Sequence, residues 1–155
     1  MKLANCAKSL VSVALVLSLL CLLILWGGCA QVERKEAATS SGQAQLAHEL
    51  IGSWILVGTP EKVGKPPAAG GRYKFRTGKH WFIMQADPDT GVVQYHHGGA
   101  YTLDGDNYTE KVEFANENTA SMINTILKFK IKIEGDTYTQ VGIGNSYSEV
   151  WKRVK

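Results

Sequence analysis

Two strands joined by a tight turn are predicted by the stretch Ile126–Ile143, whose sequence is ILKFKIKIEGDTYTQVGI. In its first half, lysines at every second position alternate with apolar residues, which places the two kinds of side chain on opposite faces of a strand. Glu134, Gly135 and Asp136 then form an expected turn, and the β-forming residues from Thr137 onward start a second strand. This hairpin indicates an all-β protein.

The same succession of short strands and turns extends over most of the chain, with no convincing amphipathic helix in it. The expected strands cover residues 52–58, 72–76, 79–86, 92–97, 100–103, 108–114, 126–133, 137–143 and 146–154. Residues 59–71 hold three of the four prolines and form an expected loop. Such a sequence is typical of a β-sandwich or a barrel. Because short connections favour hairpins between neighbours, we predict an up-and-down antiparallel meander barrel of about 8–9 strands.

The chain has 155 residues and a formal net charge of +3, with basic residues spread along it. Its one dense basic set is Lys128, Lys130 and Lys132, on the polar face of the hairpin. A nucleic-acid site would need aromatic residues among these lysines, whereas the apolar side chains here point to the other face. We therefore interpret the lysines as a solvated outer face and expect no nucleic-acid partner.

All three cysteines, Cys6, Cys21 and Cys29, lie in the first 29 residues. The rest of the sequence therefore offers no disulfide and no cysteine-ligated metal site. His96 and His97 are adjacent, so on a strand they point to opposite faces and do not chelate one metal together. The sequence shows no phosphate loop, zinc signature or nucleophile elbow, and we expect neither a metal nor another cofactor.

The amino-terminal segment has a basic start, an apolar run over residues 10–26 and small residues after it, which is typical of an export signal. Residues 27–29, Gly-Gly-Cys, resemble the end of a bacterial lipobox, which implies lipidation of Cys29. That pattern usually has leucine where Trp26 stands. The alternatives are cleavage after Ala30 and an uncleaved membrane anchor.

The sequence thus divides into a signal peptide or membrane anchor over residues 1–29, a flexible tether over residues 30–45 and a β-barrel domain over residues 46–155. The tether is rich in alanine, serine, glutamine, glutamate and lysine and has no aromatic residue, so it buries too little apolar surface to fold alone. We expect an exported protein that is membrane-anchored at the cell envelope, or else periplasmic or secreted.

Two features at the ends of the barrel domain carry a resemblance. The sequence Gly-Ser-Trp, residues 52–54, stands at the first expected strand, and Glu-Val-Trp-Lys-Arg, residues 149–153, forms the last. With the meander between them, these features resemble the lipocalin-like (calycin) domains of bacterial secreted or lipid-anchored proteins; the Thr-Asp-Tyr motif of lipocalins is absent. The resemblance implies that Trp54 plugs the closed end of the barrel and that the guanidinium of Arg153 packs on its ring.

Alternation also predicts which side chains face the barrel interior. In residues 108–114 the apolar face should be the inner one, which takes Glu110 and Phe114 inward together. Glu149 is expected to pair with Arg153. The candidate ligand-binding lining is Trp81, Tyr108, Glu110, Tyr138, Gln140 and Trp151. An interior carboxylate is unfavourable unless it is paired or hydrated, so this lining predicts either a polar network or a site for an amphipathic ligand.

The sequence therefore favours an exported cell-envelope protein that holds a small apolar or amphipathic molecule inside a β-barrel. One alternative is a structural or interaction domain, because a small barrel of eight strands can be filled by its own side chains. The other is an enzyme that uses an interior Glu110 as acid or base, which would need a positioned partner that the sequence does not show. The volume of the interior separates these hypotheses.

Overall fold

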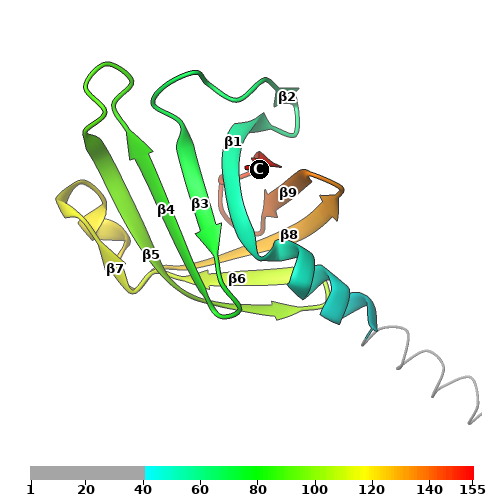
Figure 1. The fold of residues 1–155 in the computed structure, drawn as a ribbon. Coiled ribbons are helices and arrows are strands. Elements are labelled where there is room, and N and C mark those ends of the chain that lie inside the picture. Colours follow the sequence, from blue (N-terminus) through cyan, green and yellow to red (C-terminus); the bar gives the residue numbers. More distant parts are fainter. Residues whose placement is uncertain (1–40) are drawn as a thin grey trace, which may run out of the picture. The chain divides into compact units, whose positions relative to one another are not determined.

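The computed structural model describes residues 41–155, of which residues 41–50 are helical. The remainder is built around a closed antiparallel barrel (Figure 1). Its strands are β1 (Gly52–Thr59), β3 (Arg72–Arg76), β4 (His80–Ala86), β5 (Val93–Asp104), β6 (Asn107–Lys111), β8 (Ile126–Glu134), β9 (Thr137–Gly142) and β10 (Glu149–Arg153). Each barrel strand pairs with the next one along the chain. The meander barrel expected from the sequence is confirmed.

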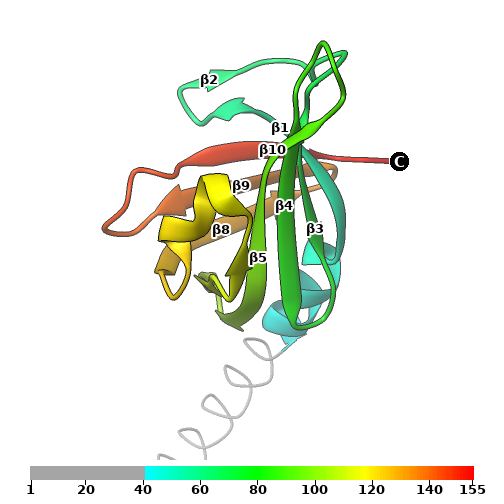
Figure 2. The same cartoon turned by 90° about the vertical axis from the view of Figure 1, so that its left-hand side faces the viewer.

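Three short elements lie outside this barrel order. β2 (Lys62–Val63) pairs with the end of β1, and β7 (Phe114–Ala115) pairs with β5. The 3₁₀ helix η1 (Glu117–Met122) follows β7, and Figure 2 shows it, in yellow, beside β5.

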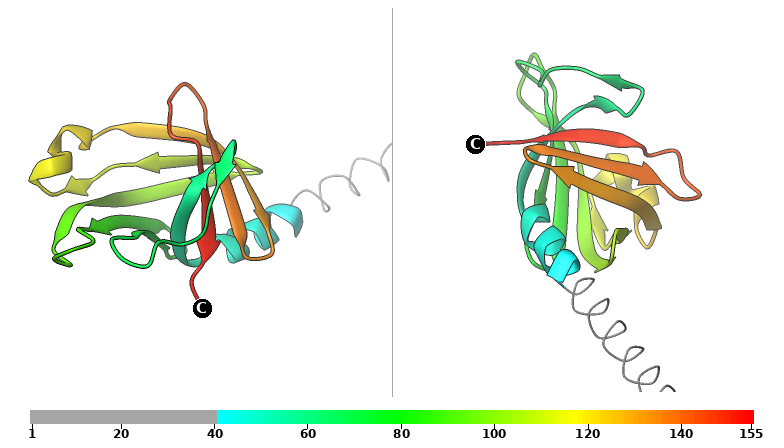
Figure 3. Two further views of the ribbon diagram at one scale, coloured as in Figure 1. Left: turned by 90° about the horizontal axis from the view of Figure 1, so that it is seen from above. Right: turned by 90° about the vertical axis from the view of Figure 1, so that its right-hand side faces the viewer.

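The barrel closes where β1 pairs with β10, and Figure 3 shows the two strands side by side. Trp54 lies opposite Arg153 in this pairing, and the register shifts between Leu56 and Gly58. Gly58 has a φ of +142°, and a Cβ atom there would lie 2.1 Å from the carbonyl oxygen of Lys62. Only glycine therefore fits this tight turn from β1 into β2.

The helical residues 42–50 pack against one end of the barrel. Leu50 is fully buried in the core, and its carbonyl oxygen accepts a hydrogen bond from Trp54 Nε1 at 3.1 Å. The buried core is Leu50, Trp54, Trp81, Ile83, Tyr108, Val112, Leu127, Phe129, Ile131, Tyr138 and Trp151. Because no disulfide links these described residues, the fold rests on this packing and on the ladder hydrogen bonds.

Two expected strand boundaries differ from the structure. The expected strands at residues 92–97 and 100–103 form one continuous strand, β5, through the glycine pair between them. A Cβ atom on Gly99 would lie 2.1 Å from the carbonyl oxygen of Lys111. The glycines therefore allow the connection after β6 to pass closely over β5, and they do not break the strand.

The expected inward position of Phe114 is wrong. β6 ends at Lys111, and Phe114 belongs to β7, where it pairs with Gly98 of β5. Its side chain lies outside the barrel, with its ring centroid 6.1 Å from that of Phe82. Inward and outward side chains were expected to alternate through residues 108–114 of a single strand. That expectation does not hold for Phe114, because the chain leaves the barrel wall after Val112.

Candidate functional site

The basic residues of β3 face the barrel interior. Lys74 and Arg76 are only 2% and 3% exposed. The aromatic residues between them, Tyr73 and Phe75, lie on the outer face with their ring centroids 6.3 Å apart. Phe75 in turn packs beside Phe82 of β4 at 6.2 Å. This strand therefore turns its polar side inward and its apolar side outward, which reverses the usual arrangement.

Lys74 lies at the centre of a buried hydrogen-bond network. Its Nζ donates to Glu110 Oε1 at 3.0 Å and to Gln140 Oε1 at 3.2 Å. The same nitrogen lies 5.3 and 5.1 Å from the ring centroids of Trp81 and Trp151. Burial lowers the pKa of Lys74, and the negative charge of Glu110 opposes that shift. The carboxylate and the aromatic rings together stabilise the ammonium form inside the barrel.

Arg76 extends the network towards the end of the barrel that the helix covers. Its Nε donates to the Tyr108 hydroxyl at 3.0 Å, and its Nη2 donates to the Tyr138 hydroxyl at 2.9 Å. Burial raises the pKa of both tyrosines, so their hydroxyls stay protonated. The Tyr108 hydroxyl then donates to Glu110 Oε1 at 2.9 Å, and Arg76 Nη2 lies 3.7 Å from the same oxygen. One carboxylate thus serves two buried cations.

The network continues towards the opposite end through Glu149. Gln140 Nε2 donates to Glu149 Oε2 at 2.8 Å, and Glu149 Oε1 lies 3.4 Å from Arg72 Nη1. The expected pairing of Glu149 with Arg153 is therefore wrong. The two residues are four positions apart on β10, which separates them by about 13 Å along the strand, and Arg153 instead donates to the Glu49 and Ile51 carbonyls.

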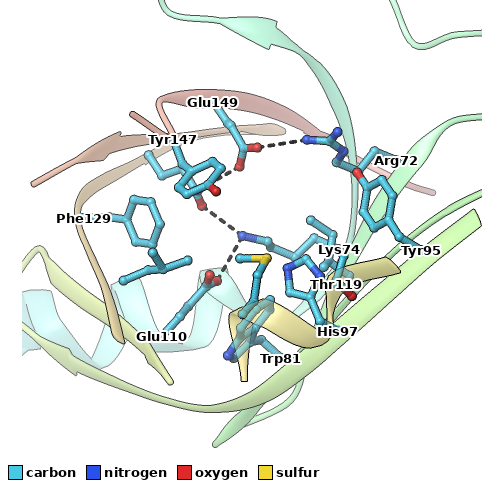
Figure 4. A pocket seen from close by; sticks show the side chains of 14 residues that line it. Arg72, Lys74, Trp81, Tyr95, His97, Glu110, Thr119, Phe129, Tyr147 and Glu149 are labelled. Carbon is cyan, nitrogen blue, oxygen red and sulfur yellow. Dashed lines mark hydrogen bonds and ion pairs between the residues drawn. The ribbon is translucent and has the colours of Figure 1, made fainter. Parts of the chain in front are cut away.

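A pocket of about 160 Å³ lies beside this network (Figure 4). The polar part of its wall is formed by Arg72, Lys74, His97, Glu110, Gln140 and Glu149. The apolar part is formed by Trp81, Ile83, Met122, Leu127 and Phe129. Tyr147, which is 45% exposed, and Met122 of η1 both border the pocket. The pocket therefore lies at the end of the barrel near η1 and is open to solvent there. The buried side chains occupy much of the barrel interior, and this small pocket is left beside the network.

His97 contributes a neutral imidazole to the pocket wall. Its ring packs edge-on to Trp81, with the centroids 5.5 Å apart, and its Nδ1 is buried without a hydrogen-bond partner in residues 41–155. Burial, helped by the positive charge of Lys74, lowers the pKa of His97 to about 4. As expected from their adjacency, His96 lies on the outer face, beside Phe82.

This shifted group makes the stability of the protein depend on pH. In the folded protein His97 stays neutral down to a pKa of about 4, whereas in the unfolded chain it takes up a proton below about 6.5. Protonation therefore favours the unfolded chain as the pH falls from about 6.5 to 4. Both the wild type and the His97→Leu variant are expected to become less stable as the pH falls over this range. Because the variant lacks the His97 contribution, its free energy of unfolding should fall by about 1–2 kcal/mol less than that of the wild type, after a discount for partial solvation.

Urea denaturation at pH 7 and pH 4.5 would measure this difference. His80→Leu is the matched control, because His80 is exposed on the strand next to β5. If the His97→Leu and His80→Leu variants lose the same free energy between the two pH values, His97 is not the group responsible.

The six residues of the predicted lining are all buried inside the barrel. Trp81, Glu110 and Gln140 border the pocket. The other three do not border it, and they support the network from beneath: Tyr108 and Tyr138 bind Arg76, and the Trp151 ring lies under Lys74.

Trp54 and Arg153 meet at the end of the barrel that the helix covers. The Cζ atom of Arg153 lies 4.2 Å from the centroid of the Trp54 ring, which is fully buried. The contact between Trp54 and Arg153 closes this end of the barrel. The pocket beside Lys74 lies in a different part of the interior.

The prediction from the sequence missed Arg72, Lys74 and His97. The alternation of basic and aromatic residues in Arg72–Arg76 was visible, but it does not say which face turns inward. The sequence did contain one indication that a cation lies inside the barrel. Glu110 was expected in the interior, and a buried carboxylate requires a nearby cation.

The same geometry weighs against acid–base chemistry at Glu110. Its Oε1 accepts hydrogen bonds from both Lys74 and Tyr108, so this oxygen is held by fixed donors. Within the described range, no group of three or more His, Cys, Asp or Glu side chains could hold a metal ion. What the arrangement offers is a small cavity with one apolar and one polar wall, which is suited to binding.

Comparison with known proteins relates this chain to others by fold. No family model and no curated protein matches its sequence. Among solved structures, a lipocalin-like protein from Bacteroides uniformis ATCC 8492 matches with a TM-score of 0.50 and 11% identity, over 68% of this chain and 98% of that one. An uncharacterized protein from Bacteroides eggerthii DSM 20697 matches with a TM-score of 0.48 and 12% identity, over 67% and 98%. With the closed barrel, the first match shows that the fold is lipocalin-like.

Proposed function

We propose that this lipocalin-like barrel binds a small apolar or amphipathic molecule in the pocket beside Lys74, and that the protein is exported and held at the cell envelope. The observation that carries the binding proposal is the cavity of about 160 Å³ that the side chains leave open. A protein cavity of about 150 Å³ is large enough to hold benzene. A molecule the size of one aromatic ring therefore fits.

The two walls of the pocket support an amphipathic occupant. Met122, Leu127 and Phe129 offer apolar surface, and the network around Lys74 and Glu110 offers charged groups already oriented by hydrogen bonds. Polar groups that are held in place before binding lose little freedom when a ligand arrives. The remaining cavity weighs against a purely structural barrel, and the engaged oxygen of Glu110 weighs against an enzyme.

A blocked pocket tests this proposal. The Met122→Trp variant places a larger side chain on the pocket wall, and Ile123→Trp is its matched control because Ile123 is exposed and does not border the pocket. Full-length protein in lipid vesicles would be dialysed against benzyl alcohol, with protein-free vesicles as background. We expect the wild type and the control to bind the probe and Met122→Trp to lose binding. Equal binding by all three proteins would contradict the proposal.

The envelope location depends on residues outside the described range, including Cys29. The sequence supports it through the basic start, the apolar run and the lipobox-like Gly-Gly-Cys. Among residues 41–155, no helix is long and apolar enough to cross a membrane. Attachment of the protein to a membrane therefore depends on the amino-terminal segment in this proposal.

Replacing Cys29 with serine tests the proposed attachment. Serine cannot form the thioether that carries the lipid, so we expect the Cys29→Ser protein to move from the membrane fraction to the soluble fraction of the host cell. Cys21→Ser, inside the apolar run, is the control and should stay with the membrane. Immunoblots of the two fractions measure the distribution, and unchanged membrane association of Cys29→Ser would reject lipidation.

A further inference from the structure

We infer that the molecule bound in this pocket carries a single negative charge, as a small monocarboxylic acid does. The inference rests on the proposed binding function and names the chemical class of the ligand. Three features of the interior support it: an uncompensated positive charge, unused hydrogen-bond donors on the polar wall, and the volume left for the body of the ligand.

The charged cluster at the pocket holds one more positive than negative charge. Lys74 and Arg76 lie 3.0 and 3.7 Å from one carboxylate, that of Glu110. The second interior carboxylate, Glu149, has its own cation in Arg72 at 3.4 Å. The described cluster therefore contains three cations and two carboxylates, a net charge of +1 (3 − 2). Arg72 is partly solvated, because 32% of its side chain is exposed. The buried excess is therefore the pair Lys74 and Arg76, which share the single carboxylate of Glu110. A bound anion would supply the second negative charge.

The polar wall also has donors that the protein itself does not use. Lys74 has three N–H groups, and two of them are taken by Glu110 and Gln140. His97 borders the same pocket. Its Nδ1 is buried without a partner in the described range, so the other ring nitrogen, Nε2, is the one that can meet a ligand. A neutral imidazole can donate one hydrogen bond and a carboxylate can accept several. Figure 4 shows both side chains directed to the same pocket, where one carboxylate could engage them.

The apolar wall limits the body of the ligand. Ile83, Leu127 and Phe129 line the pocket, and Figure 4 shows Phe129 across the pocket from Arg72 and Tyr95. A volume of about 160 Å³ accommodates a single ring or a short aliphatic chain, which is about the size of benzene. A long acyl chain does not fit inside. The structure thus favours a compact acid of the size of benzoate.

Two probes with one aromatic ring each, one charged and one neutral, test this inference. Full-length protein in lipid vesicles would be dialysed at pH 7 against benzoate and, separately, against benzyl alcohol. Both have one ring, and the acid alone is charged. We expect benzoate to bind roughly tenfold more tightly, because hydrogen bonds to a charged acceptor are stronger than neutral ones. Background partitioning into protein-free vesicles would be subtracted for each probe.

Variants then identify the residues that cause the tighter binding of benzoate. His97→Leu and Lys74→Met should each lower the ratio of benzoate affinity to benzyl alcohol affinity. Lys128→Met, which removes an exposed lysine on the outside of β8, is the matched control and should keep the preference. Far-UV circular dichroism checks the folding of each variant. If Lys74→Met does not fold, His97→Leu still decides the question.

The outcomes separate this inference from the proposed function. Tighter binding of benzoate that His97→Leu weakens supports both. Equal binding of the two probes, or tighter binding of benzyl alcohol than of benzoate, overturns the negative charge while the binding function stands. If none of the probes binds to the wild type above the Met122→Trp background, both proposals fail.

Discussion

Replacing Glu110 with glutamine will lower the free energy of unfolding by about 3–5 kcal/mol, because removing one partner of a buried ion pair leaves the other charge uncompensated. Here two cations lose their partner at once. Glu110 Oε1 accepts from Lys74 at 3.0 Å and lies 3.7 Å from Arg76. Glutamine keeps the size of the side chain, so the loss reports the charge and not a cavity. Urea denaturation at pH 7, followed by tryptophan fluorescence, measures it.

Glu113→Gln is the matched control for this change. Glu113 pairs with Lys111 at 3.3 Å on the protein surface, where both side chains are well exposed. Exposed ion pairs contribute roughly 0–1 kcal/mol, so the control should unfold nearly as the wild type does. Adding Lys74→Met to Glu110→Gln should recover part of the loss, because it removes one of the two unpaired cations. A Glu110→Gln protein as stable as the control would show that the interior network is not an ionic one.

The second large effect is expected at the other end of the barrel. Trp54→Ala should lower the free energy of unfolding by about 3–5 kcal/mol, the usual range for removing a buried large aromatic side chain. Trp54 is fully buried, and its ring packs against Tyr138 at a centroid distance of 5.4 Å and beneath Arg153. The alanine variant would leave a cavity where the interior closes. Urea denaturation again measures the loss.

Trp54→Phe separates the ring from its hydrogen bond. Phenylalanine keeps most of the packing and loses the bond from Nε1 to the Leu50 carbonyl oxygen, which should reduce stability by about 1–2 kcal/mol. Binding at the distant pocket should be unchanged in this variant. If Trp54→Ala is no less stable than Trp54→Phe, the ring does not plug this end.

The meander itself was predictable because its signals are local. Glu134–Asp136 and the turn residues at 104–107 mark hairpins through their own conformational preferences, and alternation placed Glu110 and Gln140 in the interior. These features depend on a few neighbouring residues, so the sequence displays them directly. The two expected strands at residues 92–97 and 100–103 form one strand, because the glycines between them serve a close approach by a segment that lies elsewhere in the sequence.

The orientation of β3 was not predictable from its own residues. A strand that alternates basic and aromatic residues has two defined faces, and a rule based on hydrophobicity would turn Tyr73 and Phe75 inward. The structure turns Lys74 and Arg76 inward because Glu110, on β6, lies across the interior. His97 was missed for the same reason, since its role depends on the cavity beside it. Long-range charge pairing decides these positions.

The same pairing identifies a competing arrangement that the fold must exclude. If β3 shifted by one residue relative to its neighbours, Tyr73 and Phe75 would enter the interior and Lys74 would reach solvent. That alternative has a more apolar interior, but it leaves Glu110 buried without a cation. The buried carboxylate therefore disfavours the shifted register, as single buried polar groups do in other folds.

The pairing of β1 with β10 determines when folding can finish. These strands are the first and the last of the barrel, so a chain that is synthesised or threaded through a channel from its amino end has β1 ready long before its partner arrives. Until then the sheet has two unpaired edges, which attract other strands. Folding of this domain is therefore expected to be completed only after the whole barrel sequence has been released, and loss of residues 149–155 to a protease would leave an open sheet prone to aggregation.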